Sequence, residues 1–125
     1  MNLSPLGLTS ATVPSAVPAR RAAASSGQLL AACRLAWEQG GWLVALWLTD
    51  ERERSRGYCL RVLLQDSEGF TLLEHTMPDG DVQYPDLSGL FPAAGRMQRA
   101  AFDLVGVPAD VGAAADPAEL AQRHQ

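Results

Sequence analysis

The chain has 125 residues, with ten arginines as its only basic residues apart from histidine, fourteen acidic residues and a formal net charge of −4. This length suits one domain, and the acidic balance argues against a nucleic-acid surface, which needs a basic stripe to neutralise phosphates. Two cysteines are too few for a zinc or iron–sulfur site. The sequence has no run of 18 apolar residues that could cross a membrane.

Residues 1–22 are rich in proline, serine, threonine and alanine and show no hydrophobic period. This composition predicts a disordered leader, and a docking arm that orders on a partner is the alternative. The arginines of the segment follow its apolar residues, which is the wrong order for a secretory signal. We therefore expect a cytoplasmic protein.

A first helix is predicted after Ser25 and Ser26, because either side chain can cap free backbone N–H groups. Apolar residues then recur at three- and four-residue steps, which indicates one buried helix face. These residues are Leu29, Leu30, Cys33, Ala36 and Trp37. Gly40–Gly41 should end the helix, since glycine adopts the left-handed conformation without steric cost.

Three strands are predicted next, at Trp42–Thr49, Tyr58–Gln65 and Phe70–Thr76. The first is a nearly continuous apolar run, which favours a strand buried on both faces. The connections Asp50–Gly57 and Asp66–Gly69 are short, and parallel pairing would need a much longer crossover. The strands should therefore form an antiparallel meander, and we interpret the charged connection Asp50–Gly57 as a solvated loop.

The predicted fold class is α+β, with the N-terminal helix packed on a small antiparallel sheet of three to four strands. A fourth strand at Val82–Tyr84 would end at Pro85, which cannot donate to a ladder. A second helix follows, so that residues 23–107 form the domain. Residues 108–125 form a short tail, in which Asp116–Glu119 resembles a capping box that opens a last helix.

The second helix should begin at Pro92, which suits the first helical position, and end at Gly106. Its charges run against the helix dipole, since Arg96 and Arg99 precede Asp103. Arg99 and Asp103 are also four residues apart in the weaker orientation for a pair. Both an ion pair within the domain and a contact to a partner subunit fit this arrangement. The opposite, apolar side should consist of Ala93, Ala94, Met97, Ala101 and Leu104.

The stretch Tyr84–Val107 resembles the signature of the C subunit of NADH-quinone oxidoreductases, a family that includes the matching domain of membrane-bound, energy-converting nickel–iron hydrogenases. The positions that match are Pro85, Leu87, Pro92, Ala93, Ala94, Arg99, Asp103 and Gly106. The similarity extends upstream to about residue 40. Where the family has Glu-Arg-Glu, this chain has Gln98, Arg99 and Ala100, and Asp86 replaces the family's serine.

The resemblance implies a non-catalytic accessory subunit of a complex I-like oxidoreductase or energy-converting hydrogenase. Such a subunit binds no cofactor or metal and braces the large subunit that carries the quinone or nickel–iron site, beside a small iron–sulfur subunit. It would lie peripherally at the inner face of the cell membrane. The interface residues that we predict are Tyr84, Pro85, Arg96, Arg99 and Asp103.

No catalytic constellation is recognisable in the sequence, because neither His75 nor His124 has a nucleophile and a supporting acid at a familiar spacing. Whether the chain is part of an enzyme therefore depends on its complex. The alternative function is a free-standing adaptor domain that kept the fold and lost the assembly.

Overall fold

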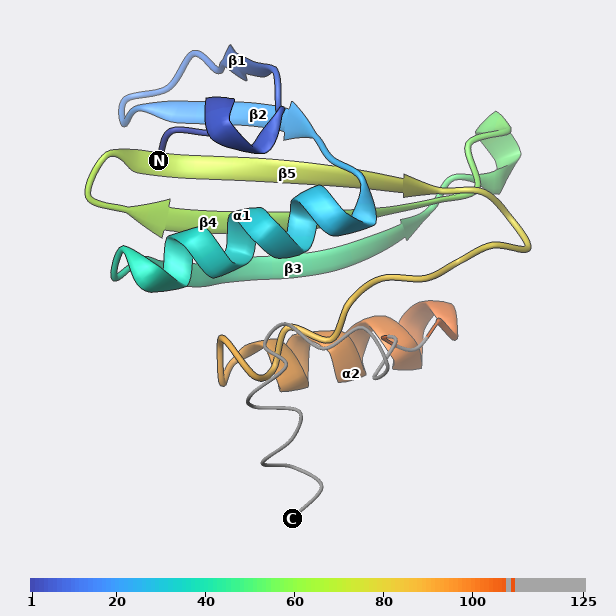
Figure 1. The fold of residues 1–125 in the computed structure, drawn as a ribbon. Helices are drawn as coiled ribbons and strands as arrows, with labels where there is room; N and C mark the ends of the chain where they lie inside the picture. Colours follow the sequence, from blue (N-terminus) through green and yellow to red (C-terminus); the bar gives the residue numbers. More distant parts are fainter. Residues whose placement is uncertain (108, 110–125) are drawn as a thin grey trace.

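The computed structural model describes residues 1–107 and residue 109 (Figure 1). Its helices and strands are, in chain order, the 3₁₀ turn Ser4–Leu6, β1 (Ser10–Thr12), β2 (Ala19–Ala23), α1 (Ser26–Glu38), β3 (Trp42–Asp50), the 3₁₀ turn Arg52–Arg54, β4 (Tyr58–Asp66), β5 (Gly69–Met77) and α2 (Ala94–Val105). The α+β class predicted from the sequence is confirmed. The predicted tail, apart from residue 109, lies outside the described residues.

The strands form one sheet in the order β1-β2-β5-β4-β3. Neighbouring strands are antiparallel except β2 and β5, which run parallel. The predicted meander is thus present as β3, β4 and β5. The sheet has five strands rather than three to four, because the N-terminal segment adds two and Val82–Tyr84 adds none.

The N-terminal segment differs from the disordered leader expected over residues 1–22. Met1, Leu3 and Leu8 are buried in the core, and β2 pairs with β5 along its whole length. The strand approaches β5 so closely that a Cβ on Gly69 would lie 2.1 Å from the carbonyl oxygen of Pro18. Only glycine fits there, and its φ of 126° also disfavours a side chain.

Helix α1 begins and ends where the sequence predicts. Ser25 and Gln28 form a reciprocal capping box, in which each side chain bonds the backbone N–H of the other residue. Gly40, with φ 77°, follows the last turn. The buried face is made of Leu29, Ala32, Cys33 and Ala36. Trp37, which we expected on that face, is 45% exposed.

The two faces of the sheet differ in cover. Leu43, Leu46 and Leu48 of β3 are buried, together with the residues that pair beside them on β4. This face lies under α1 (Figure 1). A bulge between Leu43 and Ala45 places an additional residue on the opposite face. That face is not buried at β3, so the prediction of a strand buried on both faces was wrong.

Helix α2 runs along the free edge of β3 (Figure 1). It starts at Ala94 instead of Pro92, after a turn in which the Ala94 N–H bonds the Phe91 carbonyl oxygen. Gly106 ends it in the left-handed conformation, as predicted. A helix in this position shields backbone groups that an edge strand would otherwise present to other chains.

Candidate interaction surface

The segment before α2 is anchored in the core by Tyr84 and Pro85, both of which are fully buried. The Tyr84 hydroxyl donates a hydrogen bond of 3.1 Å to the carbonyl oxygen of Val107, beyond the far end of α2. Burial, followed by the nearby Asp86 carboxylate, raises the pKa of Tyr84 to about 12. In this conformation the two residues hold α2 in place and offer no surface to a partner.

A buried polar clamp, formed by Asp86 and Gln98, joins this segment to α2. The Gln98 side chain accepts a hydrogen bond from the Leu87 N–H at 2.8 Å and donates one to Asp86 Oδ1 at 2.9 Å. Asp86 also accepts from the Ser88 N–H at 2.9 Å. In the sequence both residues stand out only as departures from the family pattern. Their twelve-residue separation gives no local signal for a contact.

The outer side of α2 carries the other predicted interface residues. Arg96, Arg99 and Asp103 are exposed, and Arg99 Nε lies 3.3 Å from Asp103 Oδ1. Two apolar residues are exposed on either side of this ion pair around the helix, Phe102 at 43% and Leu104 at 86%. Leu104 was expected on the apolar side of the helix, so its exposure corrects that prediction. The last two turns of α2 therefore present an apolar and charged surface, which we call the α2 surface.

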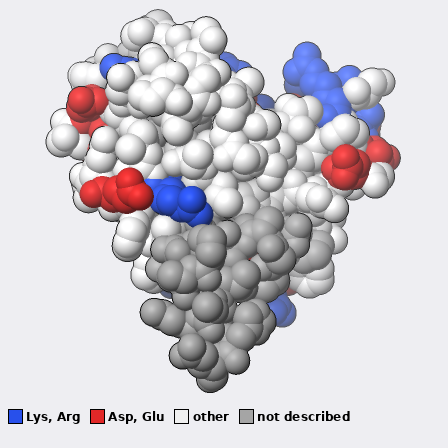
Figure 2. Space-filling view, viewed as in Figure 1, with Lys and Arg blue, Asp and Glu red and all other residues white. Residues whose placement is uncertain are grey.

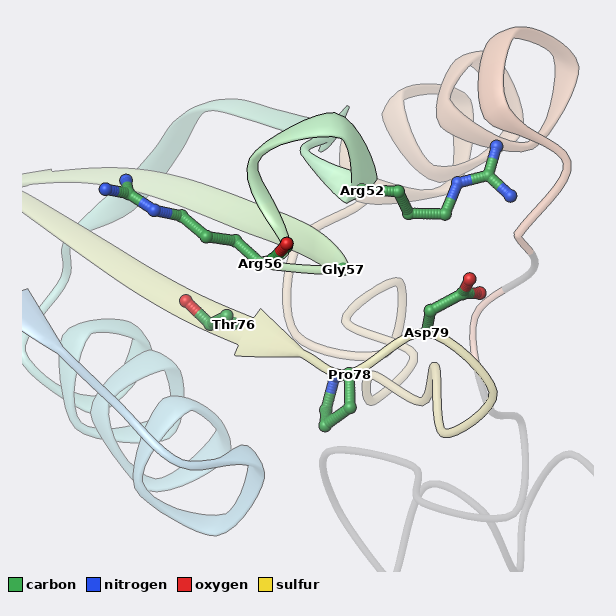
Figure 3. Close-up of a pocket in the computed structure, with 7 residues that line it drawn as sticks. Arg52, Arg56, Gly57, Thr76, Pro78 and Asp79 are labelled. Carbon is green, nitrogen blue, oxygen red and sulfur yellow. The ribbon is translucent and has the colours of Figure 1, made fainter.

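The charged connection between β3 and β4 projects beyond the sheet, and basic and acidic side chains meet there at the upper right of Figure 2. Beneath it lies an open cavity of about 540 Å³, whose lining includes Arg52, Arg56, Thr76 and Asp79 (Figure 3). Arg52 donates three side-chain hydrogen bonds to the Asp50 carboxylate, of 2.7, 2.9 and 3.1 Å, and also lies over the Tyr58 ring. The predicted solvated loop is consistent with this internal pairing.

A second group of charges crosses the uncovered face of the sheet. Glu74 accepts from Arg61 Nε at 3.0 Å and pairs with Arg21, and Arg61 also donates to the Thr49 hydroxyl at 3.0 Å. Arg21, and then Arg61, hold the pKa of the Glu74 carboxyl below its usual range. Because two arginines engage the Glu74 carboxylate, it is not a free base for catalysis.

His75 and Cys33 are not available for catalysis, because the first is hydrogen-bonded to backbone carbonyl groups and the second is buried. His75 Nδ1 lies 2.9 Å from the Ala24 carbonyl oxygen, and Nε2 lies 3.3 Å from that of Gln83. Burial raises the pKa of the Cys33 thiol to about 12, so this side chain stays protonated and unreactive. Within residues 1–107, no group of three His, Cys, Asp or Glu side chains is arranged to hold a metal ion.

Neither a family model nor a curated protein matches the sequence. Solved structures do match the fold. A trypsin-resistant fragment of Nqo5, residues 1–134 of that protein, superimposes with a TM-score of 0.71 at 13% identity, over 87% of this chain and 90% of the fragment. The chain has the fold of Nqo5. The resemblance to the oxidoreductase C subunit seen in the sequence is therefore matched in three dimensions.

A second structure with this fold is a chain of the membrane-bound sulfane sulfur reductase, an archaeal respiratory membrane complex. The TM-score is 0.68 at 14% identity, and the match covers 82% of the present chain and 62% of the other. Neither α1 nor α2 is long and apolar enough to cross a membrane, and the described part of the chain has no other α-helix.

Proposed function

We propose that the chain is a non-catalytic accessory subunit of a membrane-associated respiratory complex of the complex I type. Its partners would be the large subunit that carries the quinone or nickel–iron site and a small iron–sulfur subunit. It would brace the large subunit at the inner face of the membrane. Both Nqo5 and the sulfane sulfur reductase chain, which share the fold, support this proposal.

The α2 surface is the observation that carries the proposal. The signature residues divide into two sets, with Pro85, Leu87 and Ala94 buried and Arg99 and Asp103 exposed. The buried set fixes the position of α2, and the exposed set lies between Phe102 and Leu104 around the helix. Apolar side chains that stay exposed next to charges are typical of the core and rim of an interface.

Co-purification tests this function. The native protein, isolated with an antibody from membranes solubilised in mild detergent, should bring down a large subunit and an iron–sulfur subunit. Leu104→Glu should abolish the association without loss of folding, because the side chain it replaces is almost fully exposed. Trp37→Glu, on the outer side of α1, is the matched control and should assemble normally.

The proposal would be contradicted if the antibody recovered the folded protein without such subunits, from membranes in which the respiratory complexes stay intact. That result would favour the adaptor alternative. One observation supports that alternative, namely that the family's two carboxylates are Gln98 and Ala100 here. Gln98 is turned inward to Asp86 and Leu87 and so offers nothing to a partner. An adaptor would not associate with respiratory subunits, so neither the wild type nor Leu104→Glu would bring any of them down.

A further inference from the structure

The uncovered face of the sheet is unusually apolar for a surface. Strand alternation places Trp42, Val44 and Trp47 of β3 on this face, opposite the buried leucines. Trp42 is 51% exposed and Trp47 38% exposed. An antiparallel sheet can leave one face to water, but that face is then normally polar. A contiguous exposed apolar patch marks an interaction surface.

The same face carries a groove at its opposite edge. This groove, of about 360 Å³, is lined mainly by apolar side chains, among them Val13, Val17, Leu63, Phe70 and Leu72. It lies where the chain enters β2. The register pairs Ala19 with Phe70, Phe70 with Gln65 and Gln65 with Trp42. The exposed indole of Trp42 and the groove thus occupy the two ends of one row across the sheet.

A pair of opposite charges lies in another row of this face, two rows from that of Trp42. Glu74 of β5 pairs in register with Arg61 of β4 and accepts a hydrogen bond from it at 3.0 Å, and Trp47 of β3 is the next residue of the same row. Arg21 also pairs with Glu74 but lies one row away, beside Leu72. Reversing the order of the strands about the middle of the sheet sets Glu74 opposite Arg61 and Leu72 opposite Leu63.

We propose that this face binds a second copy of the chain, in a face-to-face dimer whose two-fold axis runs parallel to the strands. Such an axis reverses the strand order and keeps the rows in register, as an isologous interface requires. Trp42 of each copy then enters the groove beside Val17 of the other, and Glu74 of each copy faces Arg61 of the other. Sheets pack face to face in this way at about 10 Å. The proposal is independent of the proposed function.

Light scattering of the full-length protein after size exclusion, over a wide range of concentration, tests the dimer. The wild type should shift from monomer to dimer as concentration rises. Trp42→Glu should remain a monomer with an unchanged melting temperature, because it replaces an exposed side chain. Trp37→Glu is the matched control, since Trp37 is 45% exposed but lies on α1, and it should dimerise as the wild type does.

Mixing two variants tests the two-fold arrangement. Val17→Arg should block the groove and also give a monomer. A mixture of Trp42→Glu and Val17→Arg chains should form a heterodimer, because one intact tryptophan then meets one intact groove and the new glutamate meets the new arginine. A wild type that is monomeric at every concentration, or a folded Trp42→Glu that still dimerises, would overturn the proposal. Folded variants whose mixture stays monomeric would also overturn it.

Discussion

The two helices are of similar length but are held in different ways. Helix α1 has its own cap at Ser25 and Gln28 and a buried face that includes Leu29 and Cys33. Helix α2 follows Ala93, which has no polar side chain to cap it, and buries only Ala94, Gln98 and Ala101. It depends on contacts from the preceding segment and keeps larger apolar side chains exposed. The difference indicates that α1 serves the core and α2 serves the surface.

The largest expected difference between the two helices comes from replacing one leucine in each. Leu29→Ala should lower the free energy of unfolding by about 2–5 kcal/mol, because it leaves a cavity in the core. Leu104→Ala should change it by less than about 0.5 kcal/mol, as is usual for an exposed position. Urea denaturation of both variants measures the difference. Equal losses would mean that α2 also contributes a core face.

Gln98→Leu tests the buried clamp that holds α2. The change should cost about 1–3 kcal/mol, because the buried Leu87 N–H then loses its acceptor. Gln83→Leu, at an exposed position before the clamp, is the control and should have little effect. Denaturant unfolding again gives the values. A stable Gln98→Leu protein would show that α2 is held by apolar packing alone.

Ser25→Ala tests the cap of α1. Loss of the side-chain acceptor for the Gln28 N–H should cost about 1 kcal/mol. Ser26→Ala, one residue into the helix, should be close to neutral, since alanine has the best helix propensity. Thermal melting followed by circular dichroism compares the two. If both serines mattered equally, the cap would not explain where α1 begins.

The smallest expected effect is that of Arg99→Ala on the outer side of α2. An exposed pair four residues apart contributes about 0.3–0.5 kcal/mol, so the melting temperature should hardly change. Association with respiratory subunits should nevertheless weaken if the proposed function holds. A large loss of stability would instead assign Arg99 to the fold, which its exposed side chain does not suggest.

The sequence predicts well those elements whose signals are local. Ser25, Gly40 and Gly106 mark helix ends through capping and left-handed backbone, which depend only on near neighbours. The meander follows from two short connections. The prediction for residues 1–22 was wrong, because a strand as short and weakly apolar as Ala19–Ala23 is stabilised by its pairing with β5 and not by its own propensity.

The exposure of the predicted interface residues could be read from the sequence only in part. Arg96, Arg99 and Asp103 are exposed as an interface requires, whereas Tyr84 and Pro85 belong to the core. The sequence has no signature that tells whether an apolar residue next to a charge is buried in the core or exposed to a partner. The exposed faces of Trp42 and Leu104 were missed for the same reason, since hydrophobicity alone predicts burial.

The parallel pairing of β2 with β5 has a consequence for how the chain folds. Ala22 pairs with Leu73, so that α1, β3 and β4 all lie between the paired strands in sequence. Closing so long a loop costs chain entropy that local hairpins avoid. The β3–β4–β5 meander should therefore form first and present the edge of β5 as a template. The N-terminal segment, although synthesised first, is then the last part of the sheet to be added.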